Sequence, residues 1–169
     1  MGSASQNELL RDPSALRAHI DRTVGVEALA RGPADTDPAS LKRDSVVLFV
    51  LSQCVGGAGV GEPCLILNKR SPRVRQAGDL CCPGGGFSLP ADRLLARLMD
   101  LPGSPLKRWT GWRGRHNPRT RRLALLLSAG LREAWEEMRL NPLGVHFLGM
   151  LPQQHLVMFK RVIHPMVGW

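Results

Sequence analysis

Apolar residues follow two different patterns along this chain, short continuous runs and a period of three to four residues. Two short apolar runs, 45–52 and 63–68, flank a glycine-rich segment and predict two neighbouring buried strands joined as a hairpin. Beyond Asn117 and Pro118, an N-cap residue and a first-turn proline, the apolar positions recur every three to four residues. This period predicts a long amphipathic helix whose apolar positions are Leu123, Leu127, Leu131, Ala134 and Met138.

The segments around these elements complete the expected architecture. Residues 1–45 combine scattered apolar positions with a Pro/Asp-rich stretch, which predicts an N-terminal helical segment and a linker. The long helix should end near Asn141, and 145–151 and 157–167 have the pattern of strands. Residues 102–122, rich in Pro, Gly, Trp and basic side chains, predict a loop. We therefore expect one domain over 46–169.

Composition supports a single domain and excludes some classes of protein. A chain of 169 residues with 43% hydrophobic residues can bury one core. No run approaches the ~20 apolar residues of a membrane span, and no signal or transit peptide is evident, so we expect a soluble protein in the cytoplasm. The four cysteines lack CxxC spacing and are expected to be reduced thiols. A net charge of +9 favours anionic partners without specifying them.

The second half of the long helix carries a cluster of acidic residues. At 100° per residue, Glu133, Glu136 and Glu137 fall within an arc of about 100°, so they share one face. Their mutual repulsion suits binding of a hard divalent ion such as Mg²⁺, which takes oxygen ligands and bridges to phosphates. Arg132 is spaced to form an ion pair with Glu136. Without other signals, a solvated acidic face would be the commoner explanation.

A glycine run lies upstream of this helix. Gly84, Gly85 and Gly86 follow a predicted strand, and glycines there let backbone N–H groups approach an anion closely. A plain turn is the more common explanation of such a run. The glycine run indicates an anion site more strongly because it precedes the acidic helix in the chain.

That order resembles the Nudix box, whose pattern is G-x5-E-x7-R-E-U-x-E-E-x-G-U. The resemblance continues outside the box, and there it is similar to the coenzyme A diphosphatase branch of the family. The matching segments read LNKRS (67–71), GDLCCPGG (78–85), LGMLP (148–152) and IHPMVG (163–168). The resemblance thus covers about 46–169.

The resemblance implies an α/β/α sandwich around a mixed sheet, a mixed α+β fold, and hydrolysis of a nucleoside diphosphate linked to another moiety. Coenzyme A or acyl-coenzyme A is the implied substrate, and Mg²⁺ or Mn²⁺ the implied cofactor. Water would attack a phosphorus polarised by the metal. The implied metal ligands are Glu133, Glu136 and Glu137, with Arg132 orienting them. The implied substrate-binding residues are Arg70, Ser71, Arg75, Gly84 and Gly85, with Gly85 as the opening glycine of the box.

The sequence departs from the family pattern at several points. Between Gly85 and Arg132 lie 46 residues, an insertion of about 32 that we place near 90–117. The glutamate of the loop has no clear counterpart, and Asp92 is the candidate substitute. Arg139 stands where the box has glycine, and the histidine expected before Gly78 is missing. The family fold also continues with strands and a closing helix beyond the end of this sequence.

Alternatives to the coenzyme A substrate therefore stay open. The chain could be a Nudix hydrolase of a dinucleoside polyphosphate, a nucleotide sugar or capped RNA. It could also be a non-catalytic module that binds nucleic acid through its basic, tryptophan-bearing insertion. The insertion would otherwise be a solvated loop or a cap over a phosphorylated ligand. Among the histidines, His155 is the best candidate for a general base, and the sequence does not indicate an oligomeric state.

Overall fold

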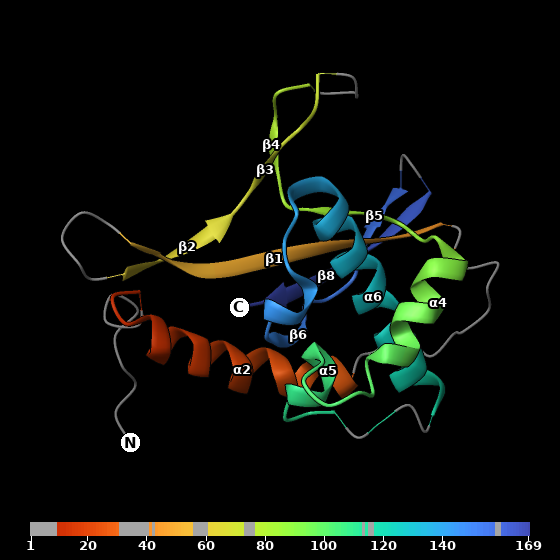
Figure 1. The fold of residues 1–169 in the computed structure, drawn as a ribbon, viewed down its shortest axis with the longest axis horizontal. Helices are drawn as coiled ribbons and strands as arrows, with labels where there is room; N and C mark the ends of the chain where they lie inside the picture. The colour runs from red at the N-terminus through yellow and green to blue at the C-terminus, as the bar shows by residue number, and fades with distance from the viewer. Residues whose placement is uncertain are drawn as a thin grey trace.

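The computed structural model describes residues 10–30, 41, 43–55, 61–72, 77–112, 114, 117–157 and 160–169. Figure 1 shows the arrangement of its helices and strands. The helices are α2 (Pro13–Ala30), α4 (Leu89–Leu98), α5 (Pro105–Arg108), α6 (Pro118–Met138) and the 3-10 turn η1 (Pro142–Gly144). The strands are β1 (Asp44–Val55), β2 (Gly61–Ile66), β3 (Asn68–Lys69), β4 (Leu80–Cys81), β5 (Gly84–Gly86), β6 (Phe147–Met150), β7 (Gln154–Leu156) and β8 (Arg161–Gly168).

Strand β1 is the centre of a mixed sheet. It pairs antiparallel with β2 and β5, and parallel with β8, where Leu48 lies opposite Met166. Strands β6 and β7 pair antiparallel with β8. The predicted hairpin of β1 and β2 is confirmed, with Val50 opposite Ile66. The short strands β3 and β4 form a separate two-stranded sheet that extends away from the main one (Figure 1).

Helix α6 covers one face of this sheet. Leu123, Leu127, Leu131 and Ala134 are buried as predicted, in one cluster with Val46 and Leu48 of β1. Gly130 permits the close approach, because a Cβ there would lie 3.0 Å from Cγ1 of Val46. The apolar period of the sequence thus correctly predicted which face of the helix meets the sheet.

Helix α2 covers the opposite face. Phe49 of β1, Val167 of β8 and Gly149 of β6 lie in register, and because side chains alternate along a strand they point away from Leu48 and Met166. A Cβ on Gly149 would lie 2.8 Å from Cγ1 of Val24 in α2. Helices therefore flank the mixed sheet on both sides, and the predicted α+β fold with an α/β/α sandwich is confirmed.

Specific residues explain why α6 begins and ends where it does. At the start, the side chain of Asn117 accepts a hydrogen bond from the backbone N–H of Thr120 at 3.0 Å, and the Thr120 hydroxyl oxygen accepts one from the backbone N–H of Asn117 at 3.4 Å, which makes a capping box. At the end, Arg139 adopts the left-handed conformation with φ 58°. Glycine is the usual residue in that conformation, so an arginine takes a strained position where the family pattern has glycine.

The predicted loop at 102–122 is confirmed in part for the described residues: α5 interrupts it, and α6 begins at Pro118, where the capping residues predicted a helix start. Ser88 and Ser104 stand at the N-caps of α4 and α5, and each helix has proline in its first turn. Trp109 and Trp112 are buried, 4% and 7% exposed. The rings of Trp109 and Phe147 meet edge to face at 5.0 Å. These indoles are core residues and are not available to stack on bases.

The C-terminal strand prediction, 157–167, is confirmed in part. Strand β8 begins at Arg161, and the short strand β7 precedes it. Sequence reasoning missed β7 because its residues are all exposed and show no apolar alternation.

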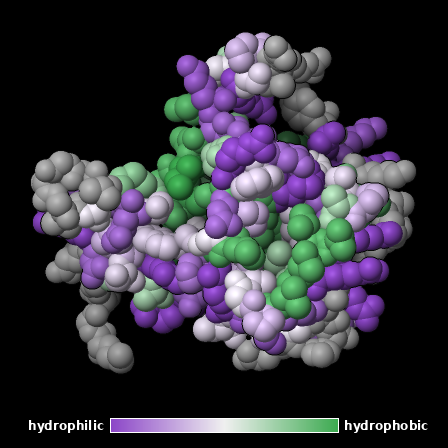
Figure 2. All heavy atoms as spheres, in the orientation of Figure 1, coloured by the Kyte–Doolittle hydropathy of each residue, from purple (hydrophilic) through white to green (hydrophobic). Residues whose placement is uncertain are grey.

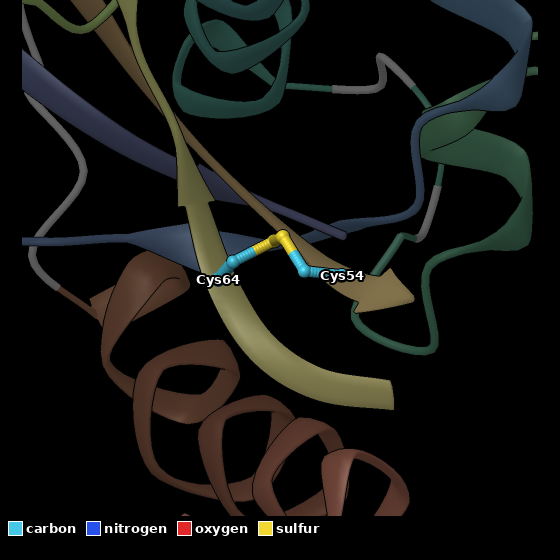
Figure 3. The surroundings of a disulfide bond; sticks show 2 residues. All are labelled: Cys54 and Cys64. Carbon is cyan, nitrogen blue, oxygen red and sulfur yellow. A yellow bond between two sulfur atoms is a disulfide. The ribbon is translucent and has the colours of Figure 1, made fainter. Parts of the chain in front are cut away.

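The prediction of four reduced cysteines is wrong for one pair. Cys54 of β1 and Cys64 of β2 form a disulfide with Cα atoms 5.9 Å apart (Figure 3). The hairpin pairs Cys64 with Ser52 and Cys54 with Glu62, so the two cysteines are diagonal neighbours across the strands. Disulfides persist mainly in oxidising compartments, and a cytoplasmic location stays a prediction.

The outer surface of helix α4 and of the turn after it is partly apolar. Leu94, Leu98 and Leu101 are exposed, and Figure 2 shows hydrophobic residues gathered over the region of α4. In the described part of the chain, no helix combines the length and the apolar character that crossing a bilayer requires.

Candidate active site

The carboxylate of Glu133 lies against the backbone of Gly85. A Cβ on Gly85 would lie 2.5 Å from Cδ of Glu133 and 2.6 and 2.7 Å from its two carboxylate oxygens. A side chain at position 85 would therefore displace the Glu133 carboxylate from its place against β5. Glycine at this position leaves room for the carboxylate.

Glu137, one helical turn further along α6, reaches the neighbouring glycine. Its Oε2 accepts a hydrogen bond from the backbone N–H of Gly84 at 3.3 Å and another from Nδ2 of Asn68 at 3.4 Å. Glu133 and Glu137 thus converge on two adjacent glycines of β5. Sequence reasoning expected the Gly84 amide to face an anionic ligand, whereas here it donates to a carboxylate of the chain itself.

Arg132 links the acidic residues of α6 to helix α4. Its Nη1 lies 3.0 Å from Oε1 of Glu133 and 3.0 Å from Oε2 of Glu136, which confirms the predicted ion pair with Glu136. Its Nη2 donates to the carbonyl of Gly86 at 2.9 Å, and its Nε donates to Oδ1 of Asp92 at 2.7 Å. The guanidinium therefore has fixed partners on both sides, and its side chain is 11% exposed.

Asp92 is fully buried at the start of α4. Its second oxygen, Oδ2, accepts a hydrogen bond from the backbone N–H of Ser88 at 2.7 Å. Counted from Gly86, five residues precede Asp92, the spacing that the Nudix pattern has between its glycine and its loop glutamate. Sequence analysis named Asp92 as the candidate substitute for that glutamate, but it did not predict the contact of Asp92 with Arg132.

These contacts shift two pKa values. Burial disfavours the charged form of Arg132, but the hydrogen bond and charge of Asp92, with the charges of Glu133 and Glu136, outweigh it and raise the pKa of Arg132 further above its ordinary value. Burial also raises the pKa of Glu133, against the opposing effect of Arg132. Repulsion from Glu136 and Glu137 adds to that increase. The ionised form of Glu133 is thus disfavoured in this environment, and a bound cation would stabilise it.

The other predicted site residues that the structure describes lie on α6 and next to the β3–β4 hairpin. Glu136 is 54% exposed and contacts Arg132, not the glycines. Arg70 and Ser71 follow β3, and the backbone of Arg70 pairs with Asp79 and Gly78 across the turn of the β3–β4 hairpin. Arg75 lies outside the described residues.

The donor set suits a hard divalent cation. Among the described residues, no group of three or more His, Cys, Asp or Glu side chains is placed to hold a metal ion. Two carboxylates, those of Glu133 and Glu137, do lie side by side against β5. Mg²⁺ retains several waters and is usually bound through one or two carboxylates together with substrate phosphates, so this pair fits its requirements.

His155, the candidate general base, lies exposed in β7. Its ring nitrogen Nε2 is 3.2 Å from Nε2 of Gln153, and within the described residues no contact joins it to Glu133 or Glu137. His164 is a core residue, as expected for the other histidines. Its Nε2 lies 3.1 Å from the Asp44 carboxylate, which also pairs with Arg122.

Comparison with known proteins finds a likeness among solved structures only. No family model and no curated protein matches this sequence. Among solved structures, the chain is similar to a Nudix hydrolase from M. Smegmatis, RenU, with a TM-score of 0.42 and 12% sequence identity. The likeness covers 75% of this chain, which spans 60% of the length of that structure. At this level it assigns neither an activity nor a substrate.

Proposed function

We propose that this chain is a metal-dependent hydrolase of the Nudix type, which cleaves the diphosphate bond of a nucleoside diphosphate linked to another moiety. The observation that carries the proposal is the convergence of Glu133 and Glu137 on Gly84 and Gly85, beside the fixed guanidinium of Arg132. Glu133 is 18% exposed, and the charge of the exposed Glu137 adds to the burial that disfavours its ionised form, so a divalent cation bound between the two carboxylates would stabilise them.

The proposed cofactor is Mg²⁺ or Mn²⁺. Glu133 and Glu137 would hold it, with Glu136 as the third proposed ligand. A bound divalent ion supplies polarisation of a phosphoryl oxygen and activation of a water molecule. The residues of the chain bind and orient: Arg132 fixes Glu133 and Glu136 by direct contacts, and Asp92 fixes Arg132.

The proposed substrate is coenzyme A or acyl-coenzyme A, which would yield a phosphopantetheine product and adenosine 3′,5′-bisphosphate. The sequence resemblance of 67–71 and 78–85 to the coenzyme A diphosphatase branch supports this choice. Asn68 contacts Glu137, and Arg70 and Ser71 follow within three residues, so these residues begin close to the carboxylates. Arg70, Ser71 and Arg75 are the proposed phosphate contacts, since arginine binds phosphate in bidentate geometry.

A panel of diphosphate compounds tests the substrate. Purified chain with Mg²⁺ or Mn²⁺ is incubated with coenzyme A, acetyl-coenzyme A, a dinucleoside polyphosphate, a nucleotide sugar and capped RNA, and the products are identified by mass spectrometry. Release of adenosine 3′,5′-bisphosphate from coenzyme A supports the proposal. Turnover of another compound alone would refute the substrate and leave the class of reaction standing.

Two neighbouring glycines offer a matched pair of variants for the site itself. Gly85→Ala would drive Cβ into the Glu133 carboxylate, whereas a Cβ on Gly86 meets nothing within 4 Å. Because displacing a catalytic group by about 1 Å can cost about 100-fold in rate, we expect a loss of that order in Gly85→Ala and little change in Gly86→Ala. Equal activity of the two variants would contradict the assignment of Glu133.

The second candidate is a non-catalytic module that binds nucleic acid. Exposed Arg119 and Arg121 near the start of α6 favour it, while Arg122 is buried against Asp44 and cannot contribute. Affinity for RNA that falls steeply with salt, and is lost on neutralising Arg119 and Arg121, would support this function. Glu137→Gln would then leave RNA binding unchanged.

A further inference from the structure

A pocket of about 370 Å³ lies between α2, α5 and β6 and shares no lining residue with the carboxylate cluster. Its size is at the lower end of the ~300–1,000 Å³ of small-molecule sites. The wall combines apolar with ionisable side chains from three elements far apart in the sequence. The ionisable lining residues are Arg17, Asp21, Arg108 and His146.

Two of these residues, Arg17 and Arg108, are cations. In the described part of the chain, no carboxylate forms an ion pair with Arg17 or Arg108, although Asp21 also lines the pocket. Burial and the charges of Arg17 and Arg108 lower the pKa of His146, so the two arginines lie close enough to oppose its protonation. The electrostatic character of the pocket is positive.

Arg108 is held in a fixed orientation. Its Nη2 donates to the carbonyl oxygens of Leu143 and Val145, which leaves the Nη1 and Nε donors of the planar group for other partners. Preorganised guanidinium groups bind oxyanions more tightly because less side-chain freedom is lost on binding. The apolar side chains beside it are Trp109, Phe147 and Leu148.

We propose that this pocket binds a small organic oxyanion, with a phosphate or carboxylate group between Arg17 and Arg108 and an apolar body against Trp109 and Phe147. Asp21 would accept a hydrogen bond from a hydroxyl of the same ligand, which favours a hydroxylated anion over a bare one. The site is distinct from the carboxylate pair and does not depend on hydrolytic activity.

The imidazole of His146 is the probe for this site. Ring signals of His146 are followed by NMR across pH with inorganic phosphate, with acetate and with sodium chloride at equal ionic strength. An anion between the arginines offsets their charge, so we expect phosphate or acetate to raise the pKa of His146 in a saturable manner. Saturation by phosphate alone identifies a phosphate site, and saturation by both identifies a general oxyanion site. No saturable shift beyond sodium chloride would overturn the proposal.

Variants on α2 provide the matched control. Arg17→Gln should weaken phosphate binding by about tenfold or more, while Arg22→Gln, an exposed arginine on the same helix outside the pocket, should not. Asp21→Asn should strengthen binding because it removes a negative charge from the wall. Glu137→Gln should leave binding unchanged, which separates this site from the proposed hydrolase. Equal binding by the Arg17 and Arg22 variants, with no gain in the Asp21 variant, would show that surface charge alone attracts the anion.

Discussion

Replacing Asp92 by asparagine removes the buried negative charge on which Arg132 depends. The Asp92 side chain is 0% exposed, and its two oxygens accept from Arg132 Nε and from the Ser88 backbone, both at 2.7 Å. The amide keeps the shape and one acceptor oxygen. The guanidinium, only 11% exposed, loses its closest counter-ion.

The size of the effect follows from this burial. Breaking a buried ion pair by removing one partner costs about 3–5 kcal/mol, and we take about 3 kcal/mol because Glu133 and Glu136 still contact Arg132. The ion pair of Arg132 with Glu136 serves as the comparison. Glu136 is 54% exposed, and exposed i, i+4 ion pairs contribute about 0.3–0.5 kcal/mol to the free energy of unfolding. Asp92→Asn should therefore destabilise the fold far more than Glu136→Gln.

Urea unfolding measures both variants. With a slope of about 2 kcal/mol per molar urea, a loss of about 3 kcal/mol lowers the midpoint by roughly 1–2 M, whereas Glu136→Gln should shift it by less than about 0.3 M. Similar midpoints for the two variants would refute the reasoning. Arg132 would then not depend on Asp92, and helix α4 would not hold the Arg132 guanidinium in place through this ion pair.

Three further predictions concern stability. Burial, and secondarily Arg122 and His155, lower the pKa of His164 against the pull of Asp44, so the unfolded chain takes up a proton before the folded one as pH falls below about 6.5. The free energy of unfolding should decrease as the pH is lowered from about 7.5 to about 5.5, and it should decrease less in His164→Gln. An equal dependence on pH in the two proteins would contradict this. Joint replacement of Cys54 and Cys64 by serine should cost about 2–3 kcal/mol in the oxidised protein, and a reductant should abolish the difference. Arg139→Gly should raise the free energy of unfolding by up to about 1 kcal/mol because it relieves the left-handed conformation, and a lower melting temperature would argue against that strain.

Local signals in the sequence predicted much of the fold. The hairpin followed from two short apolar runs and the glycine-rich segment between them, and the start of α6 followed from Asn117 and Pro118, because both depend on residues close together in the chain. The buried stripe of α6 followed from its period for the same reason. The pair of Arg132 and Glu136 lies one helical turn apart and was equally accessible to prediction.

Contacts between distant residues could not be read from local patterns. Forty positions separate Asp92 from Arg132, and the packing of α4 against α6 brings them together. Trp109 is surrounded by basic residues in the sequence and yet packs on Phe147 of β6, so its neighbours suggested a loop while tertiary packing buried it. The Cys54–Cys64 disulfide depends on strand register, which cysteine spacing does not specify.

Binding of Mn²⁺, followed by electron paramagnetic resonance or calorimetry, tests the metal-binding role of the two carboxylates most directly. We predict saturable binding that weakens at least about tenfold in Glu133→Gln and in Glu137→Gln. Glu62→Gln, at an exposed carboxylate on β2, should bind as the parent chain does. Mn²⁺ binding that does not saturate, or that all three variants share unchanged, would contradict the account.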